Sequence, residues 1–198
     1  MIISKEKMTV EEAKNKVFAI PGVGTSAYLS LRLALGDVDY RVVPFDEIMP
    51  SVKSGEYDVG VIIHEGQLTW KDEGVNLVLD LGIWWNEKTG LPLPLGGNVV
   101  RKDLGLEMCG KITKDVRNSI EHSLSNPEEA LKFAKEWGRG IDDETNEEFV
   151  GMYVNKRTLD YGDDGREAIR LFLRKGQEIG MVRPNLDVDS IVFFGSGE

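Results

Sequence analysis

The sequence predicts an α/β protein in which a mainly parallel sheet is followed by a helical region. In the first 80 residues, short apolar runs rich in β-branched side chains alternate with helical segments. The runs lack the polar and apolar alternation of a half-exposed strand, so they fit strands that are covered on both faces. From residue 103 onward the pattern is helical only. A chain of 198 residues with 41% hydrophobic side chains can bury one large domain or two small lobes.

The elements of the α/β region are each bounded by turn residues. Strands are expected at residues 17–20, 40–43, 57–63 and 75–79. Helices are expected at residues 25–35 and 46–54, and they end at Gly36 and Gly55. Because helices separate the strands, the strands are expected to run parallel.

The helical region carries an apolar stripe along its first helix. The stripe recurs every four residues, at Met108, Ile112, Val116, Ile120 and Leu124. Further helix starts are indicated at Asn126-Pro127, Asp142-Asp143 and Asp163-Asp164, and the last helix, from about residue 165, ends at Gly180. An apolar stripe needs a partner surface. Either these helices pack back on the α/β region, or part of their partner lies outside this chain.

Composition argues against nucleic-acid and membrane partners. The formal net charge is −10, and such a chain repels phosphate backbones and anionic lipid. A small anion can still bind, because helix N-termini act at short range. Cys109 is the single cysteine, which fits a reducing compartment, and no stretch has the pattern of a signal peptide or the length of a transmembrane helix. A soluble cytoplasmic protein is therefore expected.

His64 is the strongest candidate for a catalytic residue. It directly follows the apolar strand at residues 57–63, at the carboxyl edge of the sheet where open α/β folds bind ligands. An ordinary imidazole is mostly neutral at pH 7 and can accept a proton. A histidine that caps a loop is the alternative interpretation. Glu65 could orient the imidazole, and Gln67 and Thr69 could bind a substrate, or these three residues could simply begin a helix.

The turn at residues 21–28 is the second candidate for a site. It joins a strand to a helix, and its glycines let the backbone approach a ligand such as a carboxylate or a phosphate. Thr25 and Ser26 add hydroxyl groups. The turn is not a Walker loop, and it departs from the dinucleotide-binding pattern because Ala27 stands where a third glycine belongs. A tight turn with a Ser/Thr cap is the alternative.

Residues 82–97, with the sequence GIWWNEKTGLPLPLGG, form a third unusual segment. Two adjacent tryptophans cannot both face one core, so one could line a cavity. The Pro-x-Pro-x-Gly run is stiff and extended, as a connection between lobes would be, and an irregular crossover loop is the alternative. Two histidines (His64 and His122) and one cysteine are too few for a typical metal site, and His122 is expected to be a solvated helix residue.

Three blocks together resemble the 1,4-dihydroxy-6-naphthoate synthase family of the futalosine route to menaquinone. They are AIPGVGTSAYLSLRL, DVGVIIHEGQLTW and VLDLGIWWNEKTGLPLPLGGNVVRKDL, and their order and spacing match. The later NPEEAL and MYVN segments match too, so the resemblance covers nearly the whole chain. The joint occurrence of the histidine block and the TGLPLPLG block makes it specific.

The resemblance implies a two-lobed fold like that of a type II periplasmic binding protein. The substrate would be cyclic dehypoxanthine futalosine, an aromatic carboxylate, and the product would be 1,4-dihydroxy-6-naphthoate after loss of the sugar-derived fragment. The family's proton acceptor falls on His64. Its substrate-binding pair falls on Ser26 and Ala27, with Thr25 adjacent. No metal and no organic cofactor is implied.

The resemblance also assigns a domain organisation. Residues 1–5 would be an inter-lobe strand, residues 6–90 a complete α/β second lobe, and residues 91–102 a crossover. Residues 103–198 would be helices that pack on the first lobe. In family members, the N-terminal part of that lobe precedes the segment that matches residues 1–5. We therefore expect self-association or pairing with a chain that supplies this half-lobe. Two other interpretations remain open, a non-catalytic lobe that binds an aromatic carboxylate and a truncated gene product.

Overall fold

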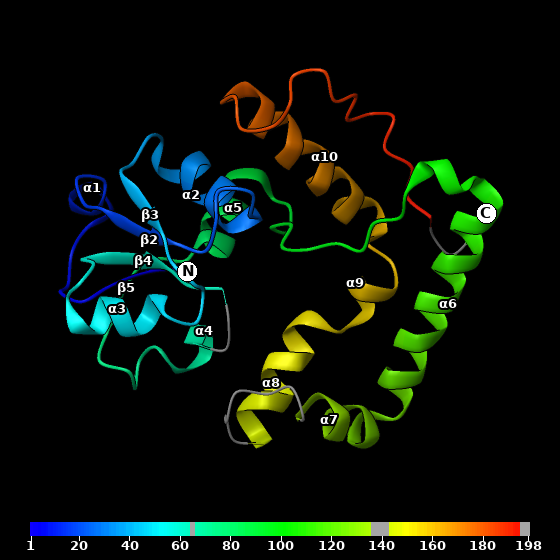
Figure 1. Ribbon diagram of the computed structural model, residues 1–198, viewed down its shortest axis with the longest axis horizontal. Helices are drawn as coiled ribbons and strands as arrows, with labels where there is room; N and C mark the ends of the chain where they lie inside the picture. Colours follow the sequence, from blue (N-terminus) through cyan, green and yellow to red (C-terminus); the bar gives the residue numbers. More distant parts are fainter. Residues whose placement is uncertain (64–65, 136–142, 195–198) are drawn as a thin grey trace. The chain divides into compact units, whose positions relative to one another are not determined.

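The computed structural model describes residues 1–63, 66–135 and 143–194, and these residues form a mixed α/β fold with a five-stranded sheet (Figure 1). The strands are β1 (Ile2–Ser4), β2 (Phe18–Ile20), β3 (Tyr40–Val42), β4 (Val59–Val61) and β5 (Asn76–Leu79). The helices are α1 (Val10–Ala13), α2 (Ser26–Leu35), α3 (Ile48–Ser54), α4 (Gly66–Thr69), α5 (Leu81–Thr89), the 3-10 turn η1 (Lys102–Leu104), α6 (Leu106–Ser125), α7 (Pro127–Lys135), α8 (Asp143–Tyr153), α9 (Lys156–Leu159) and α10 (Gly162–Glu178).

The chain divides into two compact units. Unit 1 comprises Met1–Gly96 and Glu167–Val188, and unit 2 comprises Gly97–Arg166 and Asp189–Glu198. Unit 1 therefore holds the whole sheet and most of α10. The predicted helical region after residue 103 is thus divided between the units.

The sheet of unit 1 has the strand order β3-β2-β4-β1-β5. β2 pairs in parallel with both β3 and β4, whereas β1 is antiparallel to β4 and β5. Four strands therefore share one direction, and β1 lies between two of them in the opposite direction. The α/β class that the sequence predicts is confirmed. The sheet is mixed because residues 2–4 form an antiparallel strand between β4 and the edge strand β5.

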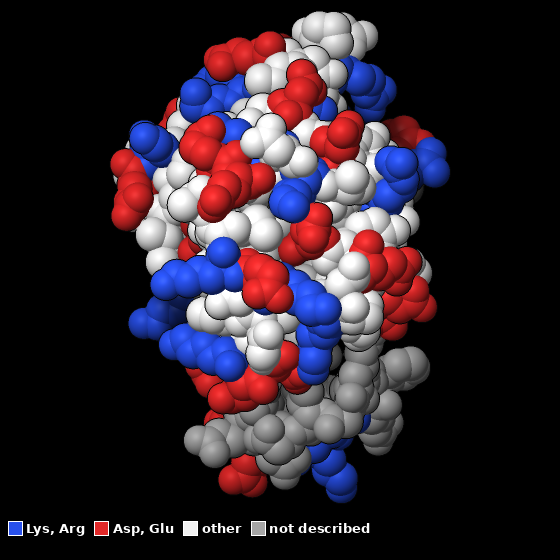
Figure 2. Space-filling view, turned by 90° about the vertical axis from the view of Figure 1, so that its left-hand side faces the viewer, with Lys and Arg blue, Asp and Glu red and all other residues white. Residues whose placement is uncertain are grey.

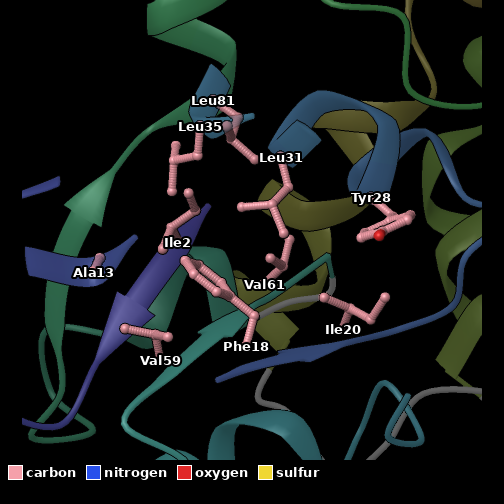
Figure 3. Packing of buried hydrophobic residues seen from close by; sticks show 10 residues of the cluster. All are labelled: Ile2, Ala13, Phe18, Ile20, Tyr28, Leu31, Leu35, Val59, Val61 and Leu81. Carbon is pink, nitrogen blue, oxygen red and sulfur yellow. The ribbon is translucent and has the colours of Figure 1, made fainter. Parts of the chain in front are cut away.

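Helices cover both faces of this sheet (Figure 1). On one face, side chains of α2 and Leu81 of α5 join Phe18 and Val61 in a buried cluster, part of which Figure 3 shows. On the other face, Ile48 and Val52 of α3 pack on Ala19. A Cβ atom at Gly60 in β4 would lie 2.7 Å from the Ile48 Cγ2 atom, so the close contact of α3 with β4 requires glycine there.

The predicted helix at residues 46–54 begins later, at Ile48, for a physical reason. Pro50 lies inside this stretch and has no N–H group to donate to a preceding turn. A start at Ile48 places Pro50 in the first turn, where N–H groups have no partner within the helix. Gly55 ends the helix with a φ of 84°, as predicted.

The segment at residues 81–89 is helix α5, so the irregular-loop interpretation is wrong for this part of the crossover. The Asp80 carboxylate caps the helix by accepting from the N–H groups of Gly82 (2.8 Å) and Ile83 (3.0 Å). Trp85 is 1% exposed and faces the core, whereas Trp84 is only partly buried. In a helix, adjacent side chains point in different directions, so Trp85 can be buried while Trp84 stays partly exposed.

Unit 2 leaves apolar side chains of α6 exposed. The stripe lies on this helix as predicted, and Met108, Val116 and Leu124 are 46%, 39% and 39% exposed. α7 begins at Pro127, as predicted. Arg166 pairs with Asp160 (3.0 Å) within the same unit. Among the residues that the structure describes, no helix is long and apolar enough to cross a membrane.

Candidate functional site

The turn between β2 and α2 is held by the side chain of Thr25. Its hydroxyl donates to the Gly22 carbonyl (2.7 Å) and accepts from the Tyr28 N–H group (3.2 Å), which caps α2. The N–H groups of Ser26 and Ala27 lie in the first helical turn and have no acceptor among the described residues. Such N–H groups, at the positive end of the helix dipole, suit an anion.

The hydroxyl of Ser26 is engaged by a distant part of the chain. It donates to the Leu95 carbonyl, 69 residues away, so it lies against the segment that follows α5. The structure thus brings Thr25, Ser26 and Ala27 together in one turn. It also adds a contact that local sequence patterns could not indicate.

His64 and Glu65, the predicted proton acceptor and its neighbour, lie outside the described residues. The residues before them are described. β4 ends at Val61, Ile62 is buried, and the Ile62 N–H group donates to the Met1 carbonyl (3.0 Å). Because β2 and β4 are adjacent and parallel, with Ala19 opposite Gly60, the strand end before His64 lies at the same sheet edge as the β2–α2 turn.

Gln67 and Thr69 lie in the short helix α4, which begins at Gly66. Their interpretation as residues at a helix start therefore agrees with the structure. Whether either side chain contacts a ligand stays a prediction. Trp70, immediately after α4, packs against the buried cluster on the α3 face of the sheet.

Tyr28 of α2 lies beside Tyr40 of β3. The Tyr28 and Tyr40 rings lie 4.9 Å apart, and the hydrogen bond with Tyr28 raises the pKa of Tyr40 above its usual range. The Arg32 guanidinium donates to the Tyr28 hydroxyl (3.3 Å), which raises the pKa of Arg32 and keeps it charged. These side chains therefore anchor α2 to β3, and the sequence gives no separate signal for this cluster.

A shallow pocket of about 320 Å³ lies away from the turn. Val17 and Asp58, which precede β2 and β4, are among its lining residues, so it opens at the opposite edge of the sheet. Lys16 and Asp58 form an ion pair (3.3 Å) at this edge. The pocket is therefore separate from the predicted site.

Within the described ranges, no group of three or more His, Cys, Asp and Glu side chains is arranged to hold a metal ion. Figure 2 shows acidic and basic side chains interspersed over the face that it draws. The described residues of this face thus present no uniformly basic surface of the kind that binds phosphate backbones.

Replacing Thr25 with alanine is expected to lower the free energy of unfolding by about 1 kcal/mol, because α2 loses its cap. Urea denaturation followed by circular dichroism measures this change. Thr25→Ser keeps the hydroxyl and serves as the matched control, with a smaller loss. Equal losses for both variants would contradict the capping role of the hydroxyl.

An open sheet with a glycine-containing turn at the carboxyl end of a parallel strand defines an α/β protein with a natural place for a small ligand. A family model described as menaquinone biosynthesis matches residues 1–178. The chain therefore belongs to the menaquinone biosynthesis family.

Two curated relatives and one solved structure are similar to the chain. A 1,4-dihydroxy-6-naphthoate synthase of Thermus thermophilus is 39% identical over 168 residues, which cover 84% of this chain and 61% of the relative. A protein of the same name from Streptomyces coelicolor is 34% identical over 188 residues, 92% of this chain and 66% of the relative. The crystal structure of a protein from Archaeoglobus fulgidus aligns with a TM-score of 0.86 and 36% identity, and the match covers 91% of this chain and 67% of that one. The chain thus spans less than two thirds of the length of the two curated relatives.

Proposed function

We propose that the chain takes part in the synthesis of 1,4-dihydroxy-6-naphthoate from cyclic dehypoxanthine futalosine. The observation that carries this proposal is the identity with two relatives named for that activity, 39% and 34% over most of this chain. The family match over residues 1–178 includes both candidate segments, the β2–α2 turn and the strand end that precedes His64. Their common sheet edge provides a place where one ligand can reach both.

In this proposal the roles of the residues follow from their chemistry. The β2–α2 turn holds a carboxylate of the substrate, because the N–H groups of Ser26 and Ala27 point from the start of α2. His64 accepts a proton that a neighbouring ketone has made acidic. The bond to the sugar-derived fragment then breaks, and formation of the aromatic ring drives the step. No metal or organic cofactor takes part.

We propose further that the chain is part of a two-lobed protein of the type II periplasmic-binding-protein kind. Unit 1 would form one lobe, and the helices of unit 2 would belong to the other. Two facts support this. The curated relatives extend beyond the match by more than a third of their length, and α6 exposes Met108, Val116 and Leu124. The unmatched part of the relatives is therefore the proposed partner of this apolar stripe.

A product assay tests these proposals. The chain is incubated with cyclic dehypoxanthine futalosine, alone and together with a polypeptide that contains the unmatched part of the Thermus relative. Chromatography then measures 1,4-dihydroxy-6-naphthoate. Product in either mixture supports the enzymatic function, and product only in the second supports the need for the partner.

The main competing function is a lobe that binds an aromatic carboxylate without converting it. The β2–α2 turn favours this alternative, because its N–H groups could bind a carboxylate without any proton transfer to His64. Calorimetry with 1,4-dihydroxy-6-naphthoate distinguishes the two. Binding without product in both mixtures would replace the enzymatic proposal by this one, and the absence of both binding and product would reject both.

A further inference from the structure

We propose that Ser26 is a positioning residue, which uses its hydroxyl proton to fix the segment at residues 90–95 beside the β2–α2 turn. This inference rests on the proposed function for its effect on ligand binding. The contact itself runs from the Ser26 hydroxyl to the Leu95 carbonyl.

The segment is held through its backbone carbonyl groups. The Trp85 indole N–H group donates to the Pro92 carbonyl (3.1 Å), and the Asn86 side chain donates to the Leu91 carbonyl (3.3 Å). Ser26 provides the corresponding bond at Leu95. Three side-chain donors, two from α5 and one from α2, thus bind carbonyl groups within the five residues 91–95.

The composition of the segment explains why its carbonyl groups are used. Pro92 and Pro94 have no N–H group, so this stretch cannot pair on both sides as a strand inside the sheet. Their rings also fix the backbone angle φ, so the segment loses less conformational entropy when it is held against the rest of the chain. The Leu93 side chain packs against the buried clusters on the α2 side of the sheet. The segment is therefore stiff and anchored, and the bond to Ser26 fixes its end relative to the turn.

This arrangement changes the role expected of Ser26. A hydroxyl group can donate one hydrogen bond, and here the Ser26 hydroxyl donates it to the Leu95 carbonyl. Towards a ligand the Ser26 oxygen can only accept a hydrogen bond. The donors that the turn offers to a carboxylate are then the N–H groups of Ser26 and Ala27, and Ser26 acts through the geometry of the turn.

Limited proteolysis of the free chain tests the contact without any ligand. Ser26→Ala is expected to raise the rate at which chymotrypsin cuts after Leu95 by about 2- to 10-fold, which corresponds to one hydrogen bond to the Leu95 carbonyl. Mass spectrometry identifies the cut, and Ser26→Thr keeps a hydroxyl and is expected to restore slow cleavage. Ser30→Ala is the matched control, because the Ser30 hydroxyl lies on the same helix and donates to the Ser26 carbonyl (2.8 Å). It should leave the cleavage rate after Leu95 unchanged.

Calorimetry with 1,4-dihydroxy-6-naphthoate then tests the consequence. Ser26→Ala and Pro94→Gly are each expected to weaken binding by about 2- to 10-fold, and the double variant should be no weaker than the weaker single variant, because both act through one contact. Additive losses, or weaker binding of Ser26→Ala with unchanged cleavage after Leu95, would overturn the proposal in favour of direct ligand contact. Unchanged cleavage with unchanged binding would overturn it as well. If Ser26→Ala speeds cleavage but no variant binds the naphthoate, the proposed function fails while the positioning contact stands.

Discussion

Replacing His64 with asparagine is expected to lower the rate of product formation by about 100- to 10,000-fold, the range that a positioned acid–base group contributes. Asparagine has a similar size and can form hydrogen bonds, but it cannot accept a proton near neutral pH. His64 follows a strand end that is buried at Ile62 and lies beside β2, so the variant is expected to fold. The measurement is chromatography of 1,4-dihydroxy-6-naphthoate under the conditions that give product with the unmodified chain.

His122→Asn is the matched control for this substitution. His122 is exposed near the end of α6, with its Nδ1 atom 3.4 Å from the Asn126 side chain, and the proposed chemistry does not use it. This variant should keep full activity. Undiminished activity of His64→Asn would remove the histidine from the mechanism.

Local patterns in the sequence predicted most elements of unit 1. Thr25 and Gly36 bound α2, and Gly55 ends α3, because capping and left-handed turns depend on neighbouring residues only. Strand ends depend on pairing partners and are less well predicted. The expected strand at residues 57–63 is paired only at Val59–Val61, where the three-residue strand β1 lies beside it.

Long-range features could not be predicted in the same way. The antiparallel insertion of β1 depends on β4 and β5, more than 50 residues away. The bond from Ser26 to Leu95 joins residues that no local pattern connects. α5 is different, because Asp80 and Gly90 are ordinary start and stop signals that were present in the sequence. The adjacent tryptophans and the following prolines obscured them.

Trp85→Ala is expected to lower the free energy of unfolding by about 3–5 kcal/mol, the usual cost of removing a large buried aromatic side chain. Trp85 is 1% exposed, and its ring lies 5.4 Å from the Phe172 ring of α10 in an edge-to-face arrangement. Its indole N–H group also binds the Pro92 carbonyl. One side chain thus joins α5, α10 and the segment at residues 90–95, and urea denaturation measures the effect of removing it.

Trp84→Ala provides the control, because the same residue type stands at the next position but is only partly buried. It should cost less, whereas equal costs would contradict the packing described for Trp85. Trp85→Phe keeps a ring beside Phe172 and removes the donor to Pro92, so it is expected to cost about 1–3 kcal/mol. If Trp85→Ala unfolds more easily but binds 1,4-dihydroxy-6-naphthoate with unchanged affinity, Trp85 serves the fold and not the ligand.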